Sequence, residues 1–138
     1  MGKTIRDVMT SNPCTIDADK NVAYAAKMLR DEDVGVAPIV EGDQLVGMLT
    51  DRDIAIKVVA EGKDPQTTKV VDVASKDIVT IDPQQDLDEA LRLMAQHQVR
   101  RLPVVEEDGK VVGIVAQADV ALESDDTKTG ELVEQISQ

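Results

Sequence analysis

The segment GMLTDRD, residues 47–53, could bind a small ligand, because a hydroxyl and two carboxylates lie where a strand is expected to run into a helix. Such a junction exposes backbone N–H groups at the positive end of the helix dipole. The Asp53 carboxylate could accept two hydrogen bonds from a cis-diol such as a ribose, and the Thr50 hydroxyl could both donate and accept. Taken alone, the same two residues more often only cap a helix, so this alternative stays open.

A phosphate group beside this corner would need cations, because carboxylates repel it. Arg52, Arg100 and Arg101 are the candidates, since a guanidinium binds phosphate oxygens through paired hydrogen bonds. The number of phosphates on the ligand depends on how many arginines converge, which the sequence leaves open.

Other site chemistry has little support, because His97 is the sole histidine and Cys14 the sole cysteine. A lone histidine indicates neither a metal site nor a catalytic triad, and a lone cysteine excludes an intrachain disulfide. We expect a solvated or capping His97, and a buried Cys14 whose strand position could also place it on a ligand-site wall. We therefore predict no catalytic residue, no metal site and no enzyme activity.

Charge and composition exclude further partners. The formal net charge of −12 repels nucleic acid, and Tyr24 is the sole aromatic residue on which a base could stack. No apolar stretch approaches the roughly 18 residues that a spanning helix requires, and the N-terminus has no signal-like apolar region. The sequence predicts a cytoplasmic protein with an aliphatic core, no nucleic-acid partner and no membrane partner.

Two copies of one unit appear when the sequence is shifted on itself by about 65 positions, which places IRDVMTSNPCTID over VVDVASKDIVTID. The matched positions include Ile5 with Val70, Pro38 with Pro103, Gly47 with Gly113 and Asp53 with Asp119. Units of about 55 residues are too small to bury their faces alone, so we expect the two to pair about a pseudo-twofold axis.

Each copy is predicted to be β-α-β-β-α, which makes the fold class α+β (α/β). Helical stripes with i, i+3, i+4, i+7 spacing are Val22, Ala25, Ala26 and Leu29 in the first copy, and Leu87, Ala90, Leu91 and Met94 in the second. Short strands are expected at 15–17 and 79–81, and hairpin strands at 37–40 and 45–50. Because proline cannot donate to a ladder, Pro38 and Pro103 predict edge or strand-start positions.

Further local signals set the expected boundaries. Asp86 with Glu89 fits a capping box, and Gly62 suits the left-handed end of a helix that begins near Asp51. The resulting organisation is repeat 1 at 1–60, a linker at 61–69, repeat 2 at 70–123 and a polar tail at 124–138, in which ELVEQI could form a short helix.

The repeat, the proline-centred strands and the G-h-x-T/S-x-x-D pattern of Gly47, Thr50 and Asp53 resemble a tandem pair of cystathionine β-synthase (CBS) domains, or Bateman module. The likeness covers about residues 3 to 123. GMLTDRDIAIK and HQVRRLPVV are especially similar to small stand-alone bacterial CBS-pair proteins of the hypoxic response protein type.

The resemblance implies two clefts between the repeats, each able to hold an adenosyl ligand such as AMP, ADP, ATP, S-adenosylmethionine or NAD(H). The family's ribose-binding pair carries over onto Thr50 and Asp53, whereas the second copy keeps Asp119 but has Ala116 in place of the hydroxyl. Adenine-pocket positions of the family correspond to Cys14, Val34, Gly35, Val36, Val79, Val99, Arg100 and Arg101.

The resemblance therefore predicts a regulatory module that senses energy or metabolite state, signals to a partner protein, requires no cofactor and forms a homodimer. A ligand-free protein–protein interaction module with vestigial clefts is the alternative. Ala116 favours that alternative, while the complete Thr50 and Asp53 motif favours ligand binding. A missing hydroxyl should weaken the second cleft by up to about tenfold in affinity.

Overall fold

The computed structural model describes residues 3–123 of the 138-residue chain. Two compact units are present among the described residues: one spans Pro13–Ile78, and the other combines residues 3–12 with residues 79–123. These units divide the chain differently from the sequence repeats, because the first residues of each repeat belong with the core of the other. The segment 131–136, which could either form a short helix or fray, lies outside the described residues.

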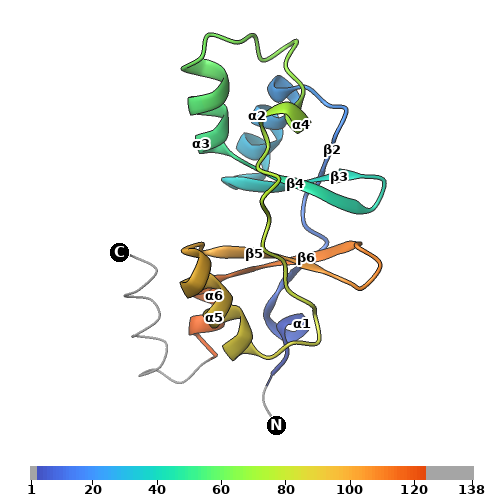
Figure 1. The fold of residues 1–138 in the computed structure, drawn as a ribbon, viewed down its shortest axis with the longest axis vertical. Helices are drawn as coiled ribbons and strands as arrows, with labels where there is room; N and C mark the ends of the chain where they lie inside the picture. Colours follow the sequence, from blue (N-terminus) through green and yellow to red (C-terminus); the bar gives the residue numbers. More distant parts are fainter. Residues whose placement is uncertain (1–2, 124–138) are drawn as a thin grey trace. The chain divides into compact units, whose positions relative to one another are not determined.

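The unit of residues 13–78 is a three-stranded sheet with helices on one face (Figure 1). Its elements are β2 (Ile16–Asp17), α2 (Val22–Glu32), β3 (Val36–Glu41), β4 (Gln44–Thr50), α3 (Asp51–Ile54), a π-helical continuation of α3 (Ala55–Val59), and α4 (Val70–Val73). The strand order is β2-β3-β4, in which β2 runs parallel to β3 and β4 antiparallel to it.

Helix α2 begins and ends where its sequence predicts. The Asn21 side chain accepts a hydrogen bond from the backbone N–H of Tyr24, which caps the helix. Val22, Ala25 and Leu29 are buried, as the stripe predicts. Ala26 is exposed, so its expected core position is wrong: it lies at the margin of the buried stripe and borders an open hollow.

The hairpin of β3 and β4 turns at Gly42, whose φ of 65° favours glycine. The expected edge or strand-start position of Pro38 is wrong, because β3 is the central strand of its sheet and begins at Val36. The proline is accommodated because β2 pairs only with Ile39 and Val40, which leaves Pro38 without a partner on that side. Pro103 does lie in an edge strand, β5.

The core of this unit is aliphatic throughout. Its buried members are Ile16, Val22, Ala25, Leu29, Ala37, Ile39, Leu49, Val58, Val70, Val73 and Ala74. Because Val70 and Val73 come from α4, the segment after the expected linker completes this core. Gly62 has a φ of 70°, and its N–H donates to the carbonyl of Val59, which confirms the predicted helix end.

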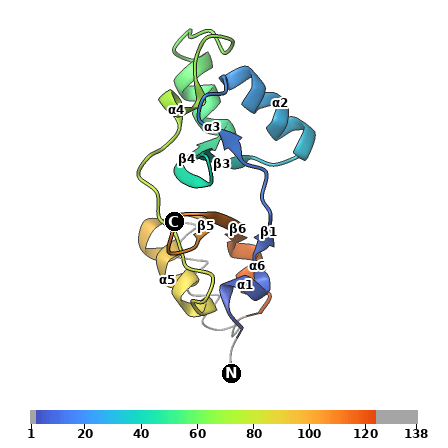
Figure 2. The same ribbon diagram turned by 90° about the vertical axis from the view of Figure 1, so that its right-hand side faces the viewer.

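The other unit also has three strands and helices (Figure 2), but its third strand, Thr10–Ser11, pairs antiparallel with the second strand of the hairpin. Its elements are α1 (Ile5–Val8), β1 (Thr10–Ser11), α5 (Leu87–His97), β5 (Arg101–Val105), β6 (Val111–Ala116) and α6 (Gln117–Ala121), with strand order β1-β6-β5. All four predicted stripe residues of α5 are buried. The expected strand at 79–81 shrinks to a single bridge between Ile81 and Val104.

The predicted capping box at α5 forms only in part. The Asp86 side chain accepts a hydrogen bond from the backbone N–H of Glu89 at 2.9 Å, as expected. The Glu89 carboxylate bonds Arg92 at 2.7 Å, one turn further along the helix. The Glu89 carboxylate therefore pairs with Arg92, three residues further along the helix, and not with the backbone N–H of Asp86.

Candidate ligand-binding site

Thr50 and Asp53 form a reciprocal capping box at the start of α3. The backbone N–H of Asp53 donates to Thr50 Oγ1, and the backbone N–H of Thr50 donates to Asp53 Oδ2, each at 3.0 Å. The Asp53 side chain is 17% exposed, so its carboxylate is mostly enclosed but still open to solvent. The capping alternative is therefore realised, and the box fixes the orientation of both side chains.

Lys57 is the cation beside this carboxylate. Its Nζ lies 3.2 Å from Asp53 Oδ1 and also donates to the carbonyl oxygen of Val73 at 3.1 Å. Arg52 was the cation predicted for this corner from the sequence, and Lys57 was not named. The i,i+4 spacing of Asp53 and Lys57 on a helix was the signal for this pair.

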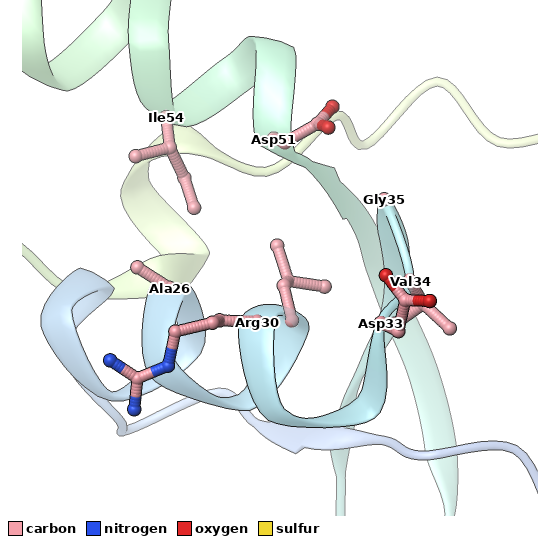
Figure 3. A pocket seen from close by; sticks show the side chains of 8 residues that line it. Ala26, Arg30, Asp33, Val34, Gly35, Asp51 and Ile54 are labelled. Carbon is pink, nitrogen blue, oxygen red and sulfur yellow. The ribbon is translucent and has the colours of Figure 1, made fainter.

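A hollow of about 470 Å³ lies beside this corner, between α2 and α3 (Figure 3). The residues that line it are Ala26, Leu29, Arg30, Asp33, Val34, Gly35, Asp51 and Ile54. Ile54 points from α3 toward α2, and the Arg30 guanidinium lies at the far side from the Asp33 and Asp51 carboxylates (Figure 3). The hollow thus has aliphatic walls and charged margins.

Two of the predicted adenine-pocket positions line this hollow, namely Val34 and Gly35. The N–H of Asp51 donates to the carbonyl of Gly35 at 3.0 Å, which ties the start of β3 to the start of α3. A Cβ at Gly35 would lie 3.3 Å from Asp51 Oδ2, so this position favours glycine while the carboxylate stays there. Val36 pairs with Thr50 across the hairpin.

Several expected residues are placed elsewhere. Thr50, Asp53, Arg52 and Cys14 do not belong to the lining of this hollow, whereas Asp51 and Ile54, which sequence reasoning did not name, do. Both missed residues belong to the segment after Thr50, at the i+1 and i+4 positions. Their place in the first turn of α3 was the available signal.

Cys14 is exposed, so the expectation of a buried residue is wrong. Cys14 precedes β2, which begins at Ile16. Ile16 is the buried residue of that strand. Partial desolvation, followed by hydrogen bonding to the Glu32 carboxylate, raises the pKa of the Cys14 thiol. A raised pKa keeps the thiol protonated and lowers its reactivity at neutral pH.

The equivalent corner in the second unit lacks the box. Ala116 is the N-cap of α6 and offers no side-chain hydrogen bond, while Asp119 is partly exposed. The N–H of Gln117 donates to the carbonyl of Arg100 at 2.8 Å, as that of Asp51 does to Gly35. Gln117 Nε2 is buried without a hydrogen-bond partner among the described residues.

The remaining predicted positions surround this second corner. Arg101 pairs with Ala116 across β5 and β6, and both Arg100 and Arg101 are exposed. Val79 and Val99 are partly buried and pack against the core of their unit. The arrangement brings the two arginines next to the start of α6 by backbone pairing.

Within residues 3–123, no group of three or more His, Cys, Asp or Glu side chains is arranged to hold a metal ion. In the same part of the chain, no helix has the length and apolar character needed to cross a membrane.

Comparison with protein families and curated proteins gives consistent matches. The CBS domain model matches residues 5–60 and 70–126. The CBS domain-containing protein YhcV of Bacillus subtilis is 43% identical over 119 residues, which are 86% of this chain and 84% of that protein. Hypoxic response protein 1 of Mycobacterium tuberculosis is 41% identical, over 86% of this chain and 82% of its own. An inosine-5'-monophosphate dehydrogenase of Korarchaeum cryptofilum is 32% identical, but only 22% of that enzyme is covered.

Solved structures agree with the sequence matches. Hypoxic Response Protein I with two coordinated zinc ions superposes with a TM-score of 0.81 at 40% identity, covering 88% of this chain and 99% of the other. The CBS domain pair of protein MJ0100, in complex with 5'-methylthioadenosine and S-adenosyl-L-methionine, gives 0.76 at 27% identity, covering 88% and 95%. A hexameric CBS-CP12 protein from cyanobacteria gives 0.76 at 30% identity, covering 93% and 75%.

Proposed function

The chain belongs to the CBS domain family, and we propose that it is a regulatory module that binds an adenosyl ligand and signals to a partner protein. The proposed ligand class comprises AMP, ADP, ATP, S-adenosylmethionine and NAD(H). The module acts in the cytoplasm as a homodimer and requires no cofactor. It has no catalytic role of its own in this proposal, since the dehydrogenase relative is matched over only a small part of its length.

The observation that carries the proposal is the Thr50 and Asp53 corner. Among residues 3–123, Asp53 Oδ2 accepts from the Thr50 N–H and Asp53 Oδ1 pairs with Lys57, so each oxygen keeps a lone pair for another donor. The Thr50 hydroxyl accepts from Asp53 N–H and keeps its own hydrogen to donate. Two acceptors and one donor, held rigidly by the box, match the hydroxyl pair of a ribose.

The hollow next to this corner supports the same ligand class. Its volume of about 470 Å³ lies within the range of roughly 300 to 1,000 Å³ that is typical of small-molecule sites. Leu29, Val34 and Ile54 supply an aliphatic surface on which a purine could pack. Asp51 at the margin adds a further acceptor for a ribose hydroxyl or an adenine amino group.

The complex of the MJ0100 CBS pair with two adenosyl compounds gives independent support. By the same reasoning, the corner at Asp119 should bind more weakly, because Ala116 supplies no hydroxyl. Arg100 and Arg101 lie beside that second corner and are the proposed phosphate contacts.

Thermal-shift screening tests the proposal directly. AMP, ADP, ATP, NAD(H) and S-adenosylmethionine are added singly, and a ligand at 100 times its Kd should add about 2.7 kcal/mol of stability. Ligand extracted from the purified protein and identified by mass spectrometry gives a second readout. No shift with any compound and no co-purified nucleotide would refute ligand binding.

Matched variants then locate the site. Asp53→Asn keeps an oxygen for the Thr50 N–H but removes the charge, and Asp119→Asn is its counterpart in the other repeat. Isothermal titration should show a larger loss of affinity for Asp53→Asn. Equal losses from both variants would contradict the assignment of the stronger site to Thr50 and Asp53.

A ligand-free docking module remains the second candidate, favoured by exposed apolar side chains. Ile56 and Val59 in the π-helical segment are 46% and 69% exposed, and Leu122 is 84% exposed. Ile56 and Val59 are three residues apart on one helical segment, and neighbouring exposed apolar side chains of this kind suit a protein partner. Unchanged thermal stability with every nucleotide, combined with partner binding that Val59→Ser abolishes, would favour this function.

A further inference from the structure

A second hollow of about 460 Å³ lies at the start of α2, at the opposite end of that helix from the hollow beside Gly35. The residues that line it are Asp19, Lys20, Asn21, Tyr24, Gln66, Thr67 and Lys69. None of them belongs to the corner proposed above for the adenosyl ligand. The segment before α4 forms one wall, and the turn before α2 forms the other.

The backbone N–H groups in the first turn of α2 already have hydrogen-bond acceptors within the protein. The N–H of Val22 donates to the carbonyl of Thr68 at 2.9 Å, and that of Ala23 donates to the carbonyl of Pro65 at 3.0 Å. The N–H of Tyr24 donates to the Asn21 side chain at 2.8 Å. Any ligand in this hollow must therefore be held by side chains.

Two ammonium groups border the hollow. Within residues 3–123, neither Lys20 nor Lys69 has a carboxylate within 4.0 Å, although the chain carries a formal charge of −12. Lys20 Nζ lies 5.0 Å from the centre of the Tyr24 ring, a cation–π distance that holds it over the aromatic face. Asp19 is the one carboxylate in the lining.

The other repeat shows that this charge is not required by the fold. Asn21 and Lys69 form an isolated antiparallel β-bridge in one unit, and Asp86 and Thr4 form the same backbone pairing in the other. The two corners therefore correspond. The matched positions are Lys20 with Gln85, Asn21 with Asp86, Tyr24 with Glu89 and Lys69 with Thr4. One corner therefore has two cations and an aromatic ring where its twin has two carboxylates.

Lys69 is also a poor choice for its structural position. It is the N-cap of α4 and makes no side-chain capping bond, because an ammonium group cannot accept from an N–H. At the equivalent helix α1, the backbone N–H of Thr4 donates to Asp7 Oδ2 at 2.8 Å within a capping box. A lysine that breaks a local rule without a structural gain points to a functional use.

We propose that this hollow binds a small oxyanion of the phosphate class, either free phosphate or the phosphoryl group of a metabolite. Lys20 and Lys69 supply the charge, since lysine binds phosphate as a point charge. Gln66 borders the same hollow with a neutral amide donor, whereas the Thr67 hydroxyl already donates to the carbonyl of Asp64. Asp19 weakens the site and favours release. The proposal does not rest on the adenosyl site.

Tyr24 makes the test site-specific, because the chain has no Phe or Trp and no second Tyr. Its ring proton resonances report on this hollow alone. Inorganic phosphate and ribose 5-phosphate are titrated separately into the full-length protein, with NaCl keeping the ionic strength constant. A saturable shift of the Tyr24 signals is expected. Tighter binding of ribose 5-phosphate identifies a metabolite, and equal binding identifies free phosphate.

Charge variants give the decisive comparison. Lys69→Gln should weaken binding by about fivefold, the effect of one charge near 4 Å in water. Lys63→Gln removes the same charge from the same segment without touching the lining, so it should change affinity by less than about twofold. Asp19→Asn should strengthen binding. A shift that does not saturate, or equal effects from Lys69→Gln and Lys63→Gln, would overturn the proposal.

Discussion

Thr50 and Asp53 hold each other through two hydrogen bonds of 3.0 Å, each side chain accepting from the other's backbone N–H. The same pair that is proposed to bind a ribose therefore also starts α3. Structural and ligand-binding roles are combined here, so a variant must separate them. The second repeat supplies the natural comparison, because Ala116 and Asp119 lack the reciprocal bonds.

Asp53→Ala should lower the free energy of unfolding by about 1 to 2 kcal/mol, since it removes an N-terminal box and leaves Lys57 without its ion-pair partner. Asp119→Ala should cost less than about 0.5 kcal/mol, because α6 has no capping bond to lose. Urea unfolding at neutral pH measures both. Equal costs would mean that the box contributes nothing to stability.

Ala116→Thr should stabilise the protein by about 1 kcal/mol, because a threonine at the N-cap of α6 can accept from the Asp119 N–H as Thr50 does from Asp53. Ala118→Thr, two residues further into the same helix, is the control and should not stabilise. Thermal unfolding of the two variants decides the matter. Under the proposed function, Ala116→Thr should also strengthen nucleotide binding at the second corner.

Gly113→Ala should destabilise the fold by about 1 to 3 kcal/mol through overpacking. A Cβ at Gly113 would lie 2.5 Å from Met9 Sδ and 2.9 Å from the carbonyl oxygen of Thr10, where β1 pairs antiparallel with β6. Gly47→Ala should cost less, since its nearest contact is Ala74 Cβ at 3.1 Å. Chemical denaturation ranks the two, and a larger loss at Gly47 would contradict this packing.

Periodicity and duplication predicted most of this fold. The stripe of α5, the hairpin strands and the left-handed Gly62 follow from residue types and spacing alone, because each depends on neighbours within one or two turns. The partners of the first residues of each repeat could not be predicted in this way. Met9 above Gly113 and Ala74 above Gly47 are long-range contacts that no local pattern encodes.

The candidate site was predicted in its residue types but not in its arrangement. The sequence motif identified Thr50 and Asp53, and hairpin register brings Val36 next to Thr50. The orientation of the first turn of α3 determines whether Asp51 or Asp53 borders the hollow. In the structure Asp51 lines it and Asp53 does not. The i,i+4 spacing alone could place Lys57 next to Asp53, but its contact with the carbonyl of Val73 could not be predicted, because Val73 belongs to a helix distant in sequence.

Cys14 should react slowly with iodoacetamide at neutral pH. Desolvation and the Glu32 carboxylate raise the pKa of the thiol, so the thiolate, which is the nucleophile, is scarcer than in a free cysteine. The alkylation rate should rise with pH and reach its midpoint above that of a free thiol. Glu32→Gln should move this midpoint to lower pH, because a neutral amide no longer disfavours the thiolate. Asp31→Asn is the control, since Asp31 pairs with Arg30. If both variants shift the midpoint equally, the contact between Cys14 and Glu32 is not the cause.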